Sequence, residues 1–324
     1  MKPNPNSMEA RDLASVFHPA TNLKQLQQSG PTYFERGAGI FVYDADGKDF
    51  IEGVAGLWCA SLGHGVEEIA DAAREEMTHY SFSHLFGGRT HRTAIELAEK
   101  IKELAPVPIG KVFFGCSGSD ANDTQVKLLR YYNNALGRPK KKKIIARERA
   151  YHGVTVASGS LTGLPKFHAL FDLPIDGIIR VAAPYPYRDA EAGEKEEDYA
   201  ARLAADLEET ILREGPETIA GFIAEPVMGV GGVLIPPAGY FERVRALCDE
   251  YEIILIDDEV ICGFWRTGKC FGSEATGMTP DTMTIAKALS AAYAPISAVM
   301  VPDWLYEAMI EPSGELGTFA HGFT

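Results

Sequence analysis

Short, almost continuously apolar segments alternate with amphipathic segments along most of this chain of 324 residues. The apolar segments predict strands at Lys111–Phe114, Lys143–Ala146, Ile219–Ala224 and Ile253–Ile256. The segments between them carry apolar residues at helical spacing and predict helices at Asp120–Leu136, Asp198–Arg213 and Tyr240–Tyr251. Strands with so little polar alternation are typical of a parallel sheet that is buried on both faces. The sequence therefore predicts an α/β fold with a mostly parallel sheet and helices on both faces.

The first part of the chain follows a different pattern. Ile40–Ile51 predicts two strands joined by an Asp-Gly turn, because that dipeptide is a strong local signal for a β-hairpin. Val66–Tyr80 predicts a helix in which Ile69, Ala73 and Met77 recur at every fourth position. We therefore expect a small N-terminal segment ahead of the main sheet.

Bulk composition excludes several classes of function. The formal net charge is −14, so the phosphate backbone of a nucleic acid would be repelled. No apolar run approaches the ~18 residues of a membrane-spanning helix, and the start of the chain lacks the apolar stretch of a secretory signal. The cysteines form no CxxC pair, which favours a reduced protein without a disulfide framework or a cysteine-rich zinc site. We expect a cytoplasmic protein that binds neither nucleic acid nor membranes.

One basic run, Arg138–Lys143, stands out in this acidic chain. A site for a polyanion is one interpretation of such a run. We interpret it instead as a solvated loop before a strand, because the chain as a whole is acidic.

Three polar clusters each follow a predicted apolar strand, where parallel sheets bind their ligands. In the first, Gly115–Asn122, small residues precede a helix whose first N–H groups carry roughly +0.5 of charge from the helix dipole. That arrangement favours an anion such as phosphate; the alternative is a capped turn in which Asp120 accepts the first helical amides. In the second, Ala150–Gly153, Tyr151 is placed to stack on a flat ligand, and a half-buried tyrosine at the rim of the core is the alternative.

The third cluster is Ile253–Val260. Side chains alternate along a strand, so Asp258 and Val260 are expected on one face and Asp257 and Glu259 on the other. An acid at a strand end, beside a branched apolar side chain, suits a ring nitrogen that must stay protonated. A solvated acidic strand end is the alternative.

Lys287 lies among small residues in Ala286–Ser290. Partial desolvation would favour the neutral, nucleophilic amine, whereas an exposed helix is the default place for a single lysine. An anion site, a stacking aromatic ring, an acid for a ring nitrogen and Lys287 together make up the set of groups that pyridoxal phosphate (PLP) requires.

The sequence resembles the class III aminotransferases, which are fold-type I PLP-dependent transferases, and in particular the omega-aminotransferases that pass an amino group to pyruvate. The resemblance covers the chain from the hairpin near residue 40 to the end. It rests on motifs that occur in the family's order: Ser117–Asn122, Tyr151–Gly153, Glu225-Pro226, Asp258–Val260, Gly263–Gly268, Lys287 and His321–Thr324.

This resemblance implies an activity and the residues that carry it. The reaction would move an amino group from an omega-amino acid or amine to a keto acid such as pyruvate, in a ping-pong mechanism. Lys287 would bind PLP as a Schiff base and later move the proton at the substrate α-carbon. Asp258 would pair with the ring nitrogen. Tyr151 and Val260 would pack on opposite faces of the ring.

The resemblance also assigns the rest of the pocket. Gly118 and Ser119 would hold the phosphate of PLP, and Thr324 would reach the phosphate in the neighbouring subunit of a homodimer. The remaining residues implied for the cofactor pocket are His152 and Glu225. Those implied for the substrate pocket are Trp58, Phe86, Tyr151 and Val230, with Phe86 coming from the partner subunit.

The chain departs from the family pattern at three places. Asp120 stands where glutamate is usual, and Trp265 where a small residue is common. The chain stops at Thr324, inside a motif, whereas the family continues into a C-terminal small domain. We therefore expect a fragment with an N-terminal segment at residues 1–55, which is part of the small domain, a PLP-binding large domain at residues 56–324, and no C-terminal small domain.

Other functions fit the sequence less well. An aminomutase, racemase or decarboxylase on the same PLP scaffold, and an inactive fragment, remain alternatives. Gly263–Lys269 matches the start of a nucleotide-binding phosphate loop, but Cys270 replaces the Ser or Thr that binds magnesium. Gly115–Ser119 lacks the last glycine of a serine hydrolase motif. No histidine forms an HExxH motif, so we expect no metal.

Overall fold

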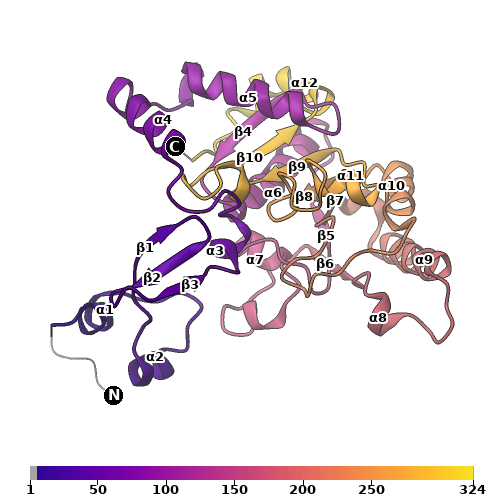
Figure 1. Cartoon of the computed structure of the whole chain (residues 1–324). Coiled ribbons are helices and arrows are strands. Elements are labelled where there is room, and N and C mark those ends of the chain that lie inside the picture. Colours follow the sequence, from indigo (N-terminus) through magenta and orange to yellow (C-terminus); the bar gives the residue numbers. More distant parts are fainter. Residues whose placement is uncertain (1–5, 324) are drawn as a thin grey trace. The chain divides into compact units, whose positions relative to one another are not determined.

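The computed structural model describes residues 6–323, and it forms two compact units that divide between Glu76 and Met77. Each unit is described by itself (Figure 1). The assignment of residues 1–55 and 56–324 to family domains stays a prediction.

The first unit is built around a three-stranded antiparallel sheet, β1-β2-β3. The predicted hairpin forms between β2 (Phe41–Asp44) and β3 (Asp49–Ile51). Its turn is fixed by Asp44, whose side chain accepts the backbone N–H groups of Asp46 and Lys48. The third strand was not predicted. The other elements of this unit are α1 (Met8–Ser15), α2 (Leu23–Ser29), β1 (Phe34–Ala38) and α3 (Ala55–Trp58). Helix α4 (Glu67–His79) begins in this unit and ends in the next one.

The second unit contains a seven-stranded sheet in which every strand but one runs in the same direction (Figure 1). In spatial order the strands are β4 (Lys111–Gly115), β10 (Ser297–Val301), β9 (Thr282–Ile285), β8 (Ile254–Asp258), β7 (Ile219–Ala224), β5 (Lys143–Arg147) and β6 (Ile178–Val181). β10 is antiparallel to both of its neighbours, and the other pairs are parallel. This confirms the predicted mostly parallel sheet.

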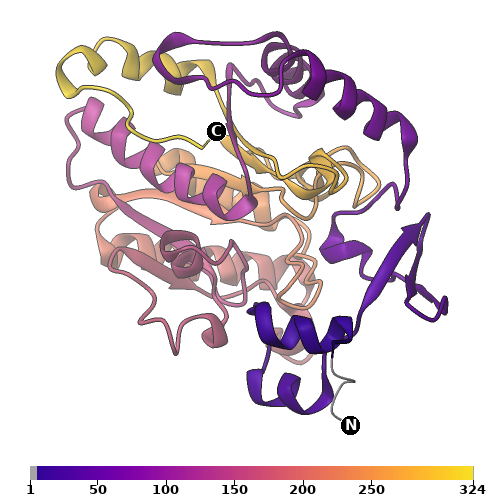
Figure 2. The ribbon, with the colours of Figure 1, turned by 90° about the vertical axis from the view of Figure 1, so that its left-hand side faces the viewer.

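Helices cover both faces of the seven-stranded sheet (Figure 2), and alternate residues of the central strands pack into two separate cores. Ile145 and Phe222 pack with helices α9 (Glu196–Glu214) and α10 (Tyr240–Glu250). Their chain neighbours Ile144 and Ile223 pack on the opposite face. The helices of that face are α6 (Gly118–Ala135), α7 (Val156–Leu161) and α12 (Asp303–Ile310). The period of two along each strand thus explains why uninterrupted apolar strands need helices on both faces.

The remaining elements are short apart from α5. They are η1 (Phe86–Gly88), α5 (Arg92–Leu104), η2 (Pro165–Phe167), α8 (Pro186–Asp189), η3 (Pro216–Thr218), α11 (Gly272–Thr276), η4 (Lys287–Leu289) and α13 (Ser313–Leu316). Within residues 6–323, none of the helices combines the length and the apolar character that crossing a bilayer would take.

The basic run at residues 138–143 is the loop before a strand that we predicted, but it is only partly solvated. Lys141 is only 4% exposed, and its ammonium group donates to the carbonyl oxygens of Pro216 and Tyr251. Lys142 donates to the Arg130 carbonyl of α6, and Lys143 donates to Glu214 at the end of α9. A helix end leaves carbonyl groups without partners, so these lysines stabilise the ends of the helices that cover the sheet.

Replacing Lys141 by methionine should lower the free energy of unfolding by about 1–3 kcal/mol. The methionine retains an unbranched stem but leaves two partly buried carbonyl groups without their donor. Lys140, which is exposed, provides the control, because Lys140→Met should change stability by less than about 0.5 kcal/mol. Urea unfolding of both variants followed by circular dichroism measures the difference. Equal midpoints for the two variants would contradict this account of Lys141.

Candidate active site

Six of the seven strands of the second unit end at the same edge of the sheet, and a predicted site residue lies at or just after the end of five of them. β4 leads to Gly118 and Ser119, β5 to Tyr151 and His152, β7 to Glu225, β8 to Asp258 and Val260, and β9 to Lys287. Because these strands are parallel, their carboxyl ends lie together, and the fold gathers residues that are far apart in the sequence.

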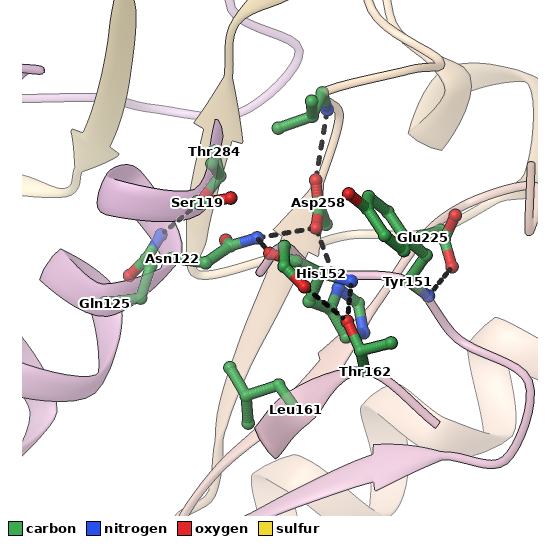
Figure 3. Close-up of polar contacts among 12 residues, drawn as sticks. Ser119, Asn122, Gln125, Tyr151, His152, Leu161, Thr162, Glu225, Asp258 and Thr284 are labelled. Carbon is green, nitrogen blue, oxygen red and sulfur yellow. Dashed lines mark hydrogen bonds and ion pairs between the residues drawn. The ribbon is translucent and has the colours of Figure 1, made fainter. Parts of the chain in front are cut away.

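Asp258 occupies the end of β8 and is held by three donors (Figure 3). Its Oδ2 atom accepts from Asn122 Nδ2 and from His152 Nδ1, each at 2.7 Å. Its Oδ1 atom accepts from the backbone N–H of Val260 at 3.1 Å. The residue is 3% exposed. Asp258 is therefore a buried carboxylate in a fixed orientation, which excludes the alternative of a solvated acidic strand end.

Asn122 and His152 orient this carboxylate. Asn122 also donates to the carbonyl oxygen of His152 at 2.8 Å, and Thr162 accepts the His152 backbone N–H (Figure 3). The His152 side chain is fully buried, so its influence on a ligand would pass through Asp258 rather than through direct contact. Sequence reasoning quoted Asn122 only as part of a motif. The sequence signal for Asn122 was its position, because it is a polar residue one helical turn after Gly118.

Glu225 fixes the backbone that carries Tyr151. Its carboxylate accepts the backbone N–H groups of Tyr151 and Gly229, both at 3.0 Å. Burial raises the pKa of Glu225. Burial also raises the pKa of Tyr151, and the negative charge of Asp258 adds to that shift. The Tyr151 ring is half-buried and meets Phe167 edge-on at 5.5 Å between ring centres, so the ring is held beside Asp258 with a restricted orientation.

The start of helix α6 differs from the capped turn that we considered as the alternative. Ser117, not Asp120, is the N-cap, and its hydroxyl oxygen accepts the Asp120 backbone N–H at 3.2 Å. The Asp120 carboxylate instead accepts from Cys116 N–H and the Ser117 and Ser297 hydroxyls, before the helix and on β10. In the described part of the chain, the N–H groups of Gly118 and Ser119 have no hydrogen-bond acceptor. The helix start therefore retains two donors for an anion.

Close packing joins this helix start to the other strand ends. A Cβ atom at Gly118 would lie 2.8 Å from both methyl carbons of Val260, so only glycine fits there without movement. A Cβ atom at Gly153 would lie 2.6 Å from Ser119 Oγ, which accepts the Val154 backbone N–H. The candidate phosphate site, Val260 and the loop of Tyr151 thus lie in direct contact.

Lys287 follows the strand next to Asp258. Asp258 is the register partner of Thr284 in β9, and Lys287 comes three residues later. Gln125 of helix α6 bonds to the Thr284 hydroxyl, which ties the helix to this strand (Figure 3). Lys287 is half-buried, and its backbone φ is 47°, a value that residues other than glycine rarely adopt. It begins the short turn η4, not an exposed helix, and such backbone strain is typical of functional sites.

Glu259 has different partners from Asp258, as the alternation along β8 predicts. It accepts the backbone N–H groups of Gly272 and Ser273 and the Ser273 hydroxyl. Burial raises the pKa of Glu259 and of Asp257, and for Asp257 the nearby Glu259 adds to the shift. Glu259 therefore holds the start of α11 rather than the candidate site, and Asp257 is buried in the core beside it.

The remaining predicted site residues lie farther along the chain from the strand ends than those described above. Val230 is half-buried in the loop that Glu225 fixes, and Phe86 is 53% exposed in η1. Trp58 belongs to the first unit. Thr324 lies outside the described residues. Trp265 adopts a φ of 67° and is 59% exposed, so the backbone there has the conformation that favours the small residue usual in the family.

The class III aminotransferase family model matches residues 24–324 of this chain. The chain belongs to the class III aminotransferases. It is 51% identical to a solved omega transaminase from Pseudomonas jessenii in complex with PMP, with a TM-score of 0.96 over 98% of this chain and 70% of that one. The recognised family and the predicted fold-type I architecture are therefore confirmed, and PLP is the cofactor of this family.

Two curated relatives have narrower names. A diaminobutyrate–2-oxoglutarate transaminase from Halomonas elongata is 47% identical over 97% of this chain and 68% of its own length. A mitochondrial gamma-aminobutyrate transaminase 1 from Oryza sativa subsp. indica is 48% identical over 99% of this chain and 63% of its own length. The chain thus spans about two thirds of the length of these relatives.

The residues at the strand edge fit PLP. The buried Asp258 carboxylate suits a protonated ring nitrogen, and the N–H groups of Gly118 and Ser119 suit a phosphate. Lys287 supplies a primary amine from the neighbouring strand. Within residues 6–323, no three side chains of the kinds that ligate metals gather in one place.

Replacing Gly118 by alanine should weaken the binding of PLP by about tenfold or more. The new Cβ atom would push the helix start away from Val260 and misalign a donor to a charged group. Gly314→Ala is the control, because a Cβ atom there meets nothing within 4 Å. Titration of each variant with PLP, followed by fluorescence quenching, measures the two affinities. If both variants bound PLP equally well, helix α6 would not hold the phosphate.

Proposed function

We propose that this chain carries the PLP-dependent transfer of an amino group from an omega-amino acid or amine to a keto acid, with pyruvate as the acceptor. The observation that supports this most strongly is the Asp258 carboxylate, oriented by Asn122, His152 and the Val260 amide, beside the strand that leads to Lys287. Bound PLP supplies an electron sink, which makes the proton on the substrate α-carbon acidic.

Each residue of the site would then have a separate role toward the cofactor. Asp258 holds the proton on the pyridine nitrogen, since a fixed carboxylate in a buried site favours the positive charge beside it. Tyr151 covers one face of the ring, and Val260 covers the other. Gly118 and Ser119 bind the phosphate through their N–H groups. Lys287 would hold the cofactor through its amine and would serve as the base that moves the proton at the substrate α-carbon.

Two further features belong to this proposal. A ping-pong order follows if the donor leaves as its keto product before the acceptor binds. A homodimer with shared active sites would bring Phe86 and Thr324 to the partner's pocket. The long similarity to proteins named as omega and gamma-aminobutyrate transaminases supports the omega-amino donor.

A substrate screen tests the proposal. The chain loaded with PLP is incubated with γ-aminobutyrate, 2,4-diaminobutyrate or β-alanine, and with pyruvate or 2-oxoglutarate. Formation of alanine from pyruvate, with parallel double-reciprocal plots as both substrates vary, is the expected result. Glutamate formed from 2-oxoglutarate, with no alanine, would replace pyruvate as the acceptor. Loss of CO₂ or inversion of the donor, without transfer, would favour the decarboxylase or racemase alternative.

A further inference from the structure

The segment 317–323, which ends in the His-Gly-Phe of the last family motif, lies along one face of helix α6 (Figure 2). Three residues of that face contact it. The Tyr131 hydroxyl donates to the Gly317 carbonyl oxygen at 2.7 Å, and Lys127 Nζ donates to the Ala320 carbonyl oxygen at 3.2 Å. Thr124 Oγ1 is 2.8 Å from His321 Nε2. The spacing of these residues places them on one side of the helix.

His321 makes the densest contacts in this segment. Its ring stacks on Phe113 of β4, with 5.9 Å between centres and 11° between planes. Phe319 and Phe323 meet the same ring edge-on. Besides Thr124 at Nε2, Lys127 Nζ lies 3.0 Å from Nδ1. Both ring nitrogens are therefore engaged by helix α6.

These partners determine where the proton of His321 lies. The Thr124 hydroxyl donates its only hydrogen to the Asp120 carbonyl oxygen at 2.8 Å, so toward His321 it can only accept. Nε2 must therefore carry the hydrogen. The Lys127 ammonium has hydrogens only to donate, so Nδ1 must be the acceptor. A second proton on the ring would replace that hydrogen bond with a contact between two cations.

We infer that His321 is the residue that positions segment 317–323 on helix α6, and that it does so only as the neutral tautomer with the hydrogen on Nε2. The helix that holds this segment is the one whose first turn carries Gly118 and Ser119. We further expect the position of this segment to affect how tightly the protein retains PLP, because the next residue, Thr324, is the proposed phosphate ligand. This expectation rests on the proposed function.

The charged surroundings set the direction of the pH dependence. Helix α6 presents Asp120, Asp123 and Lys127 to His321. His84 and His91 line the same cavity of about 1130 Å³, and β4 contributes the uncharged Phe113. Burial, followed by the charge of Lys127, lowers the pKa of His321, and the two aspartates oppose this shift only in part.

A histidine whose pKa is lower in the folded state stabilises that state fully above its unfolded pKa of about 6.5. The stabilisation is lost as the pH falls from there through the folded pKa. The contact of the segment with helix α6 should therefore weaken below neutral pH.

Nuclear magnetic resonance of histidine in the full chain tests the tautomer directly, with His321→Asn identifying the signal. The Nε2–H form and a pKa below 6.5 are expected, and Lys127→Met should raise that pKa. The Nδ1–H form, or a pKa at or above 6.5 that Lys127→Met leaves unchanged, would overturn the inference.

Chymotrypsin cleavage after Phe319 tests the positioning role. His321→Asn should speed cleavage about tenfold at pH 7.5, because two hydrogen bonds and three ring contacts are lost and cleavage follows the population of the open segment. His79→Asn, at an exposed histidine of α4, should leave the rate unchanged. The parent chain should open as the pH falls to 5.5, whereas His321→Asn should not. Equal rates for all three chains would overturn the inference.

Release of PLP from the loaded variants separates this inference from the proposed function. Faster cleavage together with faster release of PLP supports both. Faster cleavage with unchanged release supports the role of His321 and removes Thr324 from the proposed phosphate site. An unchanged rate of cleavage overturns the role of His321, whatever the rate of PLP release.

Discussion

Replacing Lys287 by alanine is expected to abolish the covalent link to PLP and to lower the rate of amino transfer by at least 10²–10⁴-fold, the usual worth of one positioned acid or base. The loss should be large because Lys287 is the amine that comes two residues after the end of β9, the strand paired with that of Asp258, and no group in the proposal replaces it as the proton carrier. Stopped-flow absorbance after mixing the PLP-loaded variant with an amine donor measures the chemical step.

The matched control is Lys140→Ala, at an exposed lysine that precedes β5 and therefore lies at the amino end of a strand whose carboxyl end carries the site. It should retain full activity and the covalent link. The account of Lys287 would be wrong if the Lys287→Ala variant still formed a borohydride-stable adduct with PLP at another lysine and transferred amino groups at the original rate.

Replacing Asp258 by asparagine is expected to lower turnover by about 10²–10³-fold, comparable to the loss of one fixed electrostatic group in an active site. Asparagine has nearly the same shape and can keep two of the three hydrogen bonds, because its oxygen still accepts from Asn122 and His152, whereas its NH₂ group cannot accept the Val260 N–H. It carries no charge, however, so the ring nitrogen would lose its proton and the cofactor would accept electrons less readily. PLP should also bind less tightly, which equilibrium dialysis can measure.

Asp257→Asn is a sharp control for this variant, because the two residues are adjacent and both are buried. Burial and the neighbouring Glu259 raise the pKa of Asp257, which favours its neutral form, and a neutral amide changes little there. We expect turnover close to that of the parent chain. If both variants lost activity to the same degree, the effect would come from the fold rather than from the charge at position 258.

The sequence predicted the elements whose signals are local. The strands at Lys143 and Ile219 and the helix at Tyr240 begin at the predicted residues, because the strands are continuous apolar runs and the helix has apolar residues at helical spacing. The strand at Phe34 and the reversed direction of β10 were not predicted. Pairing between distant segments decides both, and a single chain shows no such pairing in its local pattern.

The same distinction between local and long-range information applies to the candidate site. Motif residues such as Asp258 and Lys287 could be named, because the strand ends that carry them are visible in the sequence. Asn122 and Asp258 are 136 residues apart, and only the fold shows that they share a hydrogen bond. The burial of Lys141 was missed for a related reason, since its partners are carbonyl groups at the ends of other elements, which have no sequence signal of their own.

Peptide mapping of the borohydride-reduced, PLP-loaded chain tests the central claim most directly. The account predicts a single phosphopyridoxyl group, located by mass spectrometry on Lys287, in an amount that falls when Asp258 is replaced by asparagine. A group located mainly on any other lysine, or an amount on Lys287 no greater than on exposed lysines such as Lys140, would contradict it.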